Sequence, residues 1–144
     1  MLRGVELLEL IEVDLGLVRS RIRDAMAGCP SVIAAYVYGS VLGRARQDSD
    51  IDVGLVLDAQ ARDDPQTLDL EVALELRLGT IEGHSFDVRV FRTASPLFVL
   101  PAIRSGELVF SRDEDALTTF LERVSSAYRE DAPRHRRAVR EVLQ

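Results

Sequence analysis

The amino-acid sequence predicts a single α+β domain in which helices pack, mainly on one face, against a mixed β-sheet. Short apolar segments with the composition of β-strands alternate with longer segments whose apolar residues recur every three or four positions, the period of a helix. The chain has 144 residues, of which 47% are hydrophobic and 29% charged, so it can form one packed core. We therefore expect one domain over residues 1–144, with its core at about residues 32–110.

The first predicted element is a long amphipathic helix from about Val5 to Ala27, within a helical N-terminal segment at 5–28. Its apolar positions follow steps of three and four. Gly28 and Pro30 then end the helix, as a glycine after a helix and a proline beyond it commonly do. The expected buried stripe consists of Leu8, Ile11, Leu15, Val18, Ile22 and Met26.

Three predicted strands form the centre of the sheet. Val32–Tyr38 is apolar on both faces, which is typical of an interior strand. In the second strand, Asp50–Leu57, and the third, Ser85–Phe91, apolar and polar residues alternate with a period of two. One face of these two strands is therefore predicted to carry Ile51, Val53, Leu55, Leu57, Phe86, Val88 and Val90, and the other Asp50, Asp52, Gly54, Val56, Asp87, Arg89 and Phe91.

The remaining elements are predicted to be helices and one short strand. The second amphipathic helix should bury Leu70, Ala73, Leu74 and Leu78. C-terminal helices are expected within residues 113–143. The expected elements are a short helix at Val41–Ala45, the amphipathic helix at Pro65–Leu78, a helix at Pro96–Ser105, a strand at Leu108–Phe110, a helix at Thr118–Arg129 and a last helix from about Pro133.

Composition excludes several functional classes. A formal net charge of −6 argues against non-specific nucleic-acid binding, which depends on clustered Lys and Arg. The single Cys29 cannot form an internal disulfide, which fits a reducing compartment. The apolar segment Leu7–Leu17 is interrupted by acidic residues, so we expect no signal peptide, and no apolar run approaches the ~18 residues of a membrane span. We expect a cytoplasmic protein that contacts neither membrane nor nucleic acid.

The most informative stretch runs from Gly39 to Asp52. Gly39 and Ser40 follow the first strand, where a glycine turn that opens a short helix can offer backbone N–H groups to a phosphate. Asp50 and Asp52 lie at i and i+2 of a strand and therefore point to the same face. Two aligned carboxylates are suitable ligands for a divalent cation such as Mg²⁺.

Asp87 is a third candidate metal ligand. If its strand neighbours the strand of Asp50, all three carboxylates can converge and hold two Mg²⁺ ions. Arg44 and Arg46, near the glycine turn, are candidates for contact with a triphosphate. In isolation each feature also has an ordinary explanation as a turn, a cap or a solvent-facing residue. Their combination in this order favours nucleotide chemistry.

The segments Gly39-Ser40, Gly43-Arg44 and Ser49-Asp50-Ile51-Asp52 resemble the signature of the nucleotidyltransferase (DNA polymerase β-like) superfamily, and more closely its minimal, MNT-type members. The resemblance extends from about Val32 to Phe110. It includes Phe86-Asp87-Val88, where the family places its third carboxylate. One departure is the spacer from Val41 to Ser49, which is slightly shorter than the commonest family form.

The resemblance implies a polymerase β palm-like fold and an enzyme that uses Mg²⁺ and ATP. Gly39 and Ser40 would then bind the phosphates of the nucleotide. Asp50 and Asp52 would hold the metal ions, and Asp87 would complete the site and help to activate the acceptor hydroxyl. MNT proteins typically pair with a HEPN ribonuclease as a toxin–antitoxin system, in which the MNT antitoxin transfers AMP to a tyrosine of the toxin. The resemblance therefore implies a HEPN-domain protein as partner.

Two alternatives to protein AMPylation remain open. The chain could neutralise its partner by binding alone, with a vestigial nucleotide site, which would suit its small size and acidic composition. It could also modify a small molecule such as an antibiotic, although its length leaves no room for an acceptor-binding domain.

Several other residues receive structural interpretations. His84 and His135 are the only histidines and are far apart in sequence, so surface or loop positions are expected for them. The last helix carries a basic patch, interpreted as a solvated face or as a contact for an acidic partner or for nucleotide phosphate. Tyr36 and Tyr38 are expected to be packing residues. The basic patch of the last helix consists of Arg134, His135, Arg136, Arg137 and Arg140.

Overall fold

The computed structural model describes residues 10–11, 13–42, 45–46 and 49–143. A five-stranded sheet with the order β5-β6-β4-β2-β7 forms its centre. Strands β4 and β6 are parallel, whereas the other neighbours in the sheet are antiparallel. The strands are β2 (Val32–Tyr38), β4 (Ile51–Leu57), β5 (Thr80–Ile81), β6 (His84–Val90) and β7 (Glu107–Ser111), and a separate pair joins β1 (Leu10–Ile11) to β3 (Ala45–Arg46).

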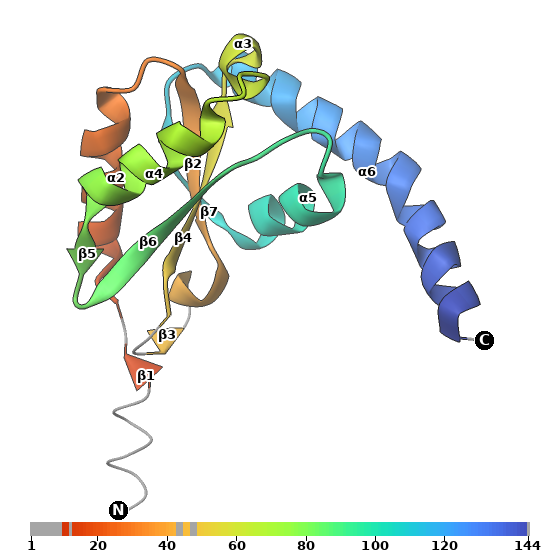
Figure 1. Ribbon diagram of the computed structural model, residues 1–144, viewed down its shortest axis with the longest axis horizontal. Coiled ribbons are helices and arrows are strands. Elements are labelled where there is room, and N and C mark those ends of the chain that lie inside the picture. The colour runs from red at the N-terminus through yellow and green to blue at the C-terminus, as the bar shows by residue number, and fades with distance from the viewer. Residues whose placement is uncertain (1–9, 12, 43–44, 47–48, 144) are drawn as a thin grey trace, which may run out of the picture.

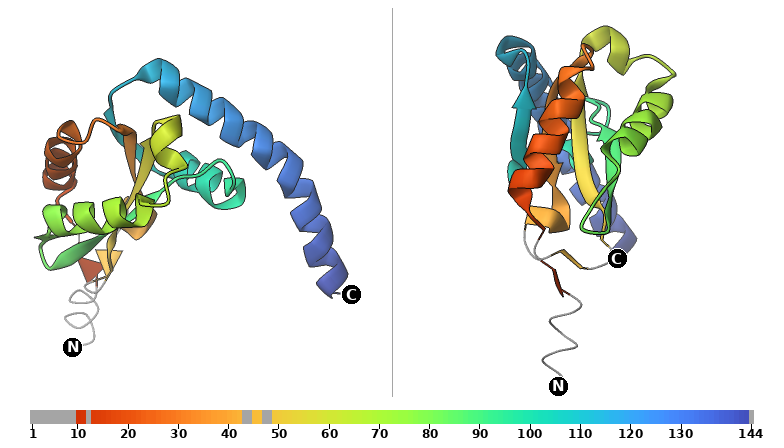
Figure 2. Two further views of the ribbon diagram at one scale, coloured as in Figure 1. Left: turned by 45° about the horizontal axis from the view of Figure 1, so that its top comes forward. Right: turned by 90° about the vertical axis from the view of Figure 1, so that its left-hand side faces the viewer.

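Helices cover both faces of the sheet (Figures 1 and 2). On one face, α2 (Leu15–Ala27) and α4 (Thr67–Leu78) pack over a core formed by alternate residues of β2, β4 and β6. On the other, α5 (Pro96–Ser105) and the first half of α6 (Glu114–Leu143) pack over a second cluster around Phe91. The expectation that the helices lie mainly on one face thus needs correction, because the second apolar cluster also requires cover.

The central strands follow their sequence pattern. β2 lies between β4 and β7, so its prediction as an interior strand is confirmed. Its residues are apolar on both sides because the two helical layers bury both faces. In β4 and β6 the predicted alternation is also confirmed, since Ile51, Val53, Leu55, Leu57, Phe86, Val88 and Val90 all belong to the core beneath α2 and α4.

Gly54 lets the second core close. It lies in the middle of β4, and a methyl group on its Cα would overlap the Phe91 ring. Phe91 is fully buried, and its ring centre lies 5.5 Å from that of Tyr38 and 6.2 Å from that of Tyr36. The absence of a side chain at Gly54 therefore provides the space for the aromatic centre of this face.

Arg112, just after β7, ties the edge of the sheet to the end of α2. Its Nη2 donates to the carbonyl oxygens of Met26 (2.7 Å) and Cys29 (3.3 Å), and its Nε donates to that of Val32 (3.1 Å). The last carbonyls of a helix have no partner within the helix, so a guanidinium at this position both satisfies and electrostatically favours them.

The N-terminal helix begins later than its apolar periodicity predicts. α2 starts at Leu15, and Asp14 caps it, since its carboxylate accepts a hydrogen bond from the Leu17 N–H (3.2 Å). Leu10–Ile11 is a strand, and the predicted start at Val5 lies outside the described residues. The cap at Asp14 is a stronger local signal than the apolar stripe that continues on its N-terminal side.

The two predicted C-terminal helices form one helix. α6 runs from Glu114 to Leu143 with Pro133 inside it. A proline removes one helical hydrogen bond, but its fixed φ is compatible with a helix, so it weakens the helix without necessarily ending it. Beyond Ala132 every described residue of α6 is exposed, and this half projects from the body of the molecule (Figure 1).

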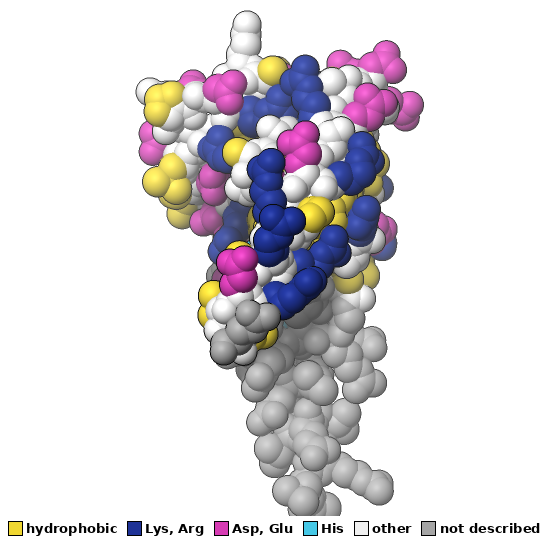
Figure 3. Space-filling view, turned by 90° about the vertical axis from the view of Figure 1, so that its right-hand side faces the viewer, with side chains coloured by type: hydrophobic (Ala, Val, Ile, Leu, Met, Phe, Trp, Pro, Cys, Tyr) yellow, Lys and Arg dark blue, Asp and Glu magenta, His cyan; other side chains and the backbone are white. Residues whose placement is uncertain are grey.

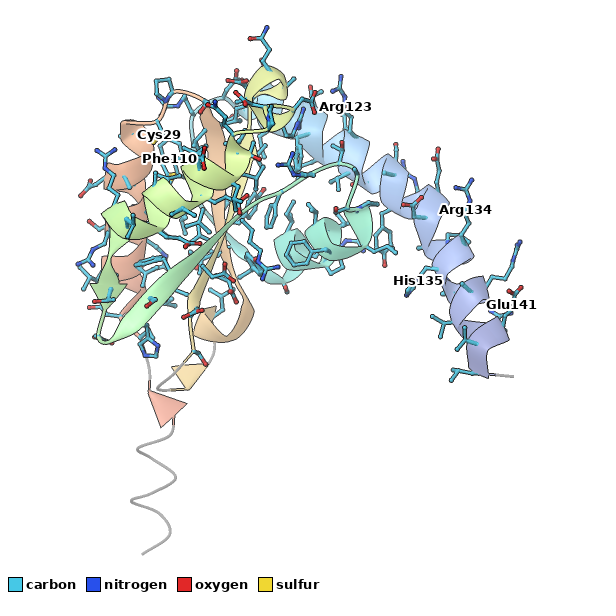
Figure 4. All side chains as sticks on the ribbon, in the orientation of Figure 1. Cys29, Phe110, Arg123, Arg134, His135 and Glu141 are labelled. Atoms are coloured by element: carbon cyan, nitrogen blue, oxygen red, sulfur yellow. The ribbon has the colours of Figure 1, made fainter. Side chains whose placement is uncertain are left out.

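The projecting half of α6 is rich in arginine. Arg134, Arg136, Arg137 and Arg140 are all exposed, and Figure 3 shows basic side chains gathered on this side of the molecule. Arg134 and His135 lie exposed on the projecting half of α6, whereas Cys29 lies just after the end of α2 (Figure 4). The expectation of a surface position for His135 is confirmed.

Smaller differences concern single turns and residues. Instead of a helix at Val41–Ala45, the structure has a short 3₁₀-helix, η1 (Gly39–Leu42), followed by β3. Ala73 is exposed rather than buried, because Thr67, Leu74 and Leu78 face the sheet and rotate Ala73 outward. A four-residue helix, α3 (Ala59–Arg62), is capped by Asp58.

In the described part of the chain, no helix combines the length and apolarity that crossing a membrane requires.

The contact between Gly54 and Phe91 yields a stability prediction. A Gly54→Ala variant should lose about 1–3 kcal/mol of unfolding free energy, because the added methyl group overpacks the core against the Phe91 ring. Chemical denaturation of both proteins measures the difference.

Combining Gly54→Ala with Phe91→Leu supplies the control. Since the smaller side chain makes room for the methyl group, the double variant should be more stable than the sum of the two single losses implies. Strict additivity would contradict the overpacking argument.

Candidate functional site

The strand register brings Asp52 and Asp87 into one row with Tyr38. In the antiparallel pair β2–β4, Tyr38 is the partner of Asp52, and in the parallel pair β4–β6, Asp52 is the partner of Asp87. Paired residues of neighbouring strands point to the same face of a sheet. The two carboxylates and the tyrosine therefore lie side by side on the face that carries α5 and α6.

Asp50 lies two residues before Asp52, next to this row. It directly precedes β4 and is exposed, and its charge contributes to the electrostatic environment of Asp52. Among the residues that the structure describes, however, no three His, Cys, Asp or Glu side chains come close enough to surround a single ion. Asp50 is exposed and Asp52 and Asp87 are half-buried, so the three acids do not form a closed cage.

Burial and like charges perturb Asp52. Burial, followed by the charge of Asp87, raises the pKa of the Asp52 carboxyl; Arg89 opposes this effect and Asp50 adds to it. Burial also raises the pKa of Tyr38 to about 12, with a further contribution from the charge of Asp52. An ionised carboxylate at Asp52 is thus disfavoured unless a cation compensates its charge.

Arg89 supplies a partial compensation. Its Nε lies 3.4 Å from Oδ2 of Asp87, two residues earlier on the same strand face. Its guanidinium carbon also lies 5.9 Å from the centre of the Phe98 ring, which itself contacts Tyr38 edge-on at 6.0 Å. Arg89 is not among the site residues expected from the sequence, although its i+2 spacing from Asp87 in the predicted strand indicates this contact.

Gly39 forms the turn beside the acids. Its φ of +77° is a conformation that residues with a side chain rarely adopt. A methyl group on Gly39 would also overlap the carboxylate of Asp52. The turn thus brings exposed backbone into contact with one of the candidate metal ligands, as expected of a phosphate-binding turn.

The other predicted nucleotide contacts are Ser40, Arg44 and Arg46. Arg44 lies outside the described residues, as do the side chains of Ser40 and Arg46. The backbones of Ser40 and Arg46 belong to η1 and β3, which frame the same turn as Gly39.

His84 is buried beneath the site, contrary to the expectation of a surface or loop position. It is 1% exposed, and its Nδ1 lies 2.6 Å from the carbonyl oxygen of Ser49, directly before Asp50. Its Nε2 has no hydrogen-bond partner among the described atoms. His84 has the same parity as Phe86, Val88 and Val90, so extending the strand alternation by one position predicts its burial.

A cleft opens beside Asp87. It encloses about 510 Å³ between α4, the edge of β6 and α5. Apolar and charged side chains both line it, including Leu68, Glu71, Val72, Asp87, Arg89 and Phe98. We refer to this hollow as the α4–α5 cleft.

Comparison with known proteins places this geometry in a family. The family model described as "Polymerase beta, Nucleotidyltransferase" matches residues 20–115. No curated protein matches the sequence.

Solved structures with a similar fold come from toxin–antitoxin complexes. A chain from the tri-AMPylated Shewanella oneidensis HEPN toxin in complex with its MNT antitoxin has a TM-score of 0.64 and 18% identity, with 90% of this chain and 98% of that chain covered. A chain from the MntA–HepT toxin–antitoxin complex has a TM-score of 0.63 and 16% identity, with 90% and 99% covered. A chain from a toxin–antitoxin structure with AMP-PNP has a TM-score of 0.61 and 16% identity, with 88% and 98% covered.

The cost of ionising the half-buried Asp52 predicts that a neutral side chain at this position makes the protein more stable. Because the folded-state pKa is raised, the protonated form contributes stability that is lost as the pH rises through that value. Asp52→Asn keeps an uncharged group at every pH. In metal-free buffer the variant should melt roughly 2–4 °C higher at about pH 7.5, with the advantage vanishing near pH 3.5, below the ordinary Asp pKa.

Thermal unfolding followed by circular dichroism measures this difference. The exposed Asp24→Asn serves as a control for the loss of one negative charge and should shift the melting temperature less. If Asp52→Asn melts lower than the wild type at neutral pH, the ionised Asp52 does not destabilise the folded protein and the prediction is refuted.

Gly39 is required for two reasons, its positive φ and the lack of space for a side chain beside Asp52, and a comparison with Gly79 separates them. Gly79 also has a positive φ, of +67°, but a methyl group there meets no atom within 4 Å. Gly79→Ala should cost about 1–2 kcal/mol for the backbone strain alone. Gly39→Ala should cost about 1 kcal/mol more, because the methyl group also displaces Asp52.

Urea denaturation of the two variants gives the comparison. Equal losses would mean that Asp52 moves away from the turn without cost.

Proposed function

The chain belongs to the polymerase beta nucleotidyltransferase family, whose model matches two thirds of it, and from this premise we propose that it transfers AMP from ATP to a tyrosine of a HEPN-domain toxin and thereby acts as an antitoxin. The observation that carries the proposal is the row of Asp52 and Asp87 beside the Gly39 turn. This row joins a phosphate-binding turn to acids suited to metal binding.

The donor set fits Mg²⁺. Asp50, Asp52 and Asp87 offer carboxylate oxygens, the hard ligands that Mg²⁺ prefers. Burial, followed by the charge of Asp87, raises the pKa of the Asp52 carboxyl, and a divalent cation beside it would favour the ionised form. When bound, Mg²⁺ would lower the pKa of the acceptor hydroxyl and neutralise the charge that develops on the leaving pyrophosphate.

The residues of the chain have distinct roles in the proposed reaction. Backbone N–H groups of the Gly39–Ser40 turn hold the phosphates, and Arg44 and Arg46 add positive charge to the triphosphate. Asp87 accepts the proton of the acceptor hydroxyl. The acceptor oxygen forms a bond to the α-phosphorus, while the bond from that phosphorus to the bridging oxygen breaks and pyrophosphate leaves with the electron pair.

The proposed partner and acceptor rest on the similar structures. One of them contains a tri-AMPylated HEPN toxin together with its MNT antitoxin, and another contains AMP-PNP. The match covers nearly the whole of those chains, so this chain contains the same domain as they do.

Neutralisation by binding alone is the second candidate. The exposed C-terminal half of α6 supports it, because such an arm could hold a partner without chemistry. Modification of a small molecule has no comparable structural support.

A transfer assay separates these functions. The chain is incubated with Mg²⁺, each of the four nucleoside triphosphates and the cognate HEPN-domain protein, whose intact mass is then measured. We expect addition of AMP from ATP, and a loss of more than about 100-fold in the Asp50→Asn/Asp52→Asn variant, since metal-assisted charge stabilisation contributes several kcal/mol.

The matched control is Asp24→Asn/Asp63→Asn, which removes the same charge from two exposed positions outside the row. It should retain wild-type transfer. Undiminished transfer by the Asp50/Asp52 variant would refute the metal site. Full inhibition of the toxin ribonuclease by that variant, without transfer, would establish neutralisation by binding.

A further inference from the structure

Helix α4, which forms one wall of the α4–α5 cleft, carries a stripe of exposed apolar residues. Leu68, Val72 and Leu76 recur every four residues along α4 and are 66%, 47% and 79% exposed. Residues at this spacing lie on one side of a helix, so the three form a continuous apolar line about 12 Å long. Exposed apolar residues in such an arrangement mark an interaction surface rather than chance exposure.

The edge of β6 next to this stripe cannot accept another strand. Beyond Ser85, β5 no longer pairs with β6, which would leave the strand edge open. Two carboxylates of α4 occupy it instead: Oε1 of Glu75 accepts a hydrogen bond from the Val88 N–H (2.9 Å), and Glu71 binds the Val90 backbone. A partner must therefore bind through side chains in the cleft rather than by strand addition.

The cleft connects the stripe to Asp87. Leu68 and Val72 line it from α4 and Phe98 from α5, and Asp87 and Arg89 of β6 line it between them. Phe98 is 42% exposed and offers a ring face and edge to an incoming aromatic side chain. A side chain that enters between these apolar walls with a polar tip would place that tip beside Asp87.

The length of the stripe indicates what binds there. Leu76 lies beyond the residues that line the cleft, and it is the most exposed of the three. A small molecule that fills the cleft would leave Leu76 uncovered, whereas a polypeptide surface could cover the whole line.

We propose that the acceptor protein docks on the stripe of Leu68, Val72 and Leu76 and inserts its modified tyrosine through the α4–α5 cleft toward Asp87. This inference rests on the proposed function for the identity of the reaction, but the docking surface itself is independent of catalysis. Apolar residues that flank the tyrosine of the acceptor pack on α4, while Arg89 and Phe98 surround the phenol ring.

Leu76→Asp tests the docking surface with two separate readouts. Calorimetric titration with the cognate HEPN-domain protein should give a Kd about tenfold or more weaker than that of the wild type. In the transfer assay the KM for that protein should rise by a similar factor, while the affinity for ATP with Mg²⁺ stays unchanged. Since Leu76 is 79% exposed, the variant is expected to fold.

Leu17→Asp is the matched control, because Leu17 is 43% exposed on α2, and an acid in the first turn of a helix is well tolerated. It should bind the HEPN-domain protein as the wild type does. Equal affinities of Leu76→Asp and the wild type would overturn the docking surface. A second result would also overturn it: the wild-type chain forms dimers in sedimentation, and Leu76→Asp makes the chain monomeric without lowering its affinity for the HEPN-domain protein.

The two readouts distinguish the inference from the proposed function. Weakened binding by Leu76→Asp together with no AMP transfer by the wild type would support docking and refute the enzymatic function. Normal transfer to the HEPN-domain protein by Leu76→Asp, with an unchanged KM, would refute docking while leaving the function intact.

Discussion

The parallel register of β4 and β6 is the constraint on which the site depends. It places Asp52 directly beside Asp87, on a face where burial already disfavours ionised carboxylates. Such an arrangement costs stability unless positive charge is nearby. Arg89 provides part of that charge for Asp87, and in the proposed function a divalent cation supplies the rest.

The surrounding fold holds this unfavourable row in place. Apolar residues on the opposite side of β4 and β6 anchor both strands to α2 and α4. On the same side as the acids, the Phe91 cluster closes against Gly54, two residues from Asp52. His84 adds a buried contact to the Ser49 carbonyl just before Asp50. The packing energy of two cores thus offsets the electrostatic cost of the site.

Local patterns in the sequence predict much of this arrangement, but long-range relations escape them. Alternation alone predicts that Asp50 and Asp52 share a face and that the opposite face of β4 is buried. It does not reveal that Asp52 faces Asp87, because register between distant strands depends on tertiary packing. The same limit explains the α6 error: Pro133 is a local breaker signal that the continuous helix overrides. By contrast, the burial of His84 follows if the alternation is carried one position further, and the contact of Arg89 with Asp87 follows from their i+2 spacing within the predicted strand.

The central claim is that Asp52 and Asp87 form one cation site beside the Gly39 turn. Anomalous diffraction from crystals grown with Mn²⁺ and a non-hydrolysable ATP analogue tests it most directly, because Mn²⁺ substitutes for Mg²⁺ and is visible as an anomalous scatterer. Density for Mn²⁺ bound by carboxylate oxygens of Asp52 and Asp87, with the phosphates at Gly39, is the predicted result. Mn²⁺ bound elsewhere, for example at Glu71 and Glu75 of α4, would contradict the account.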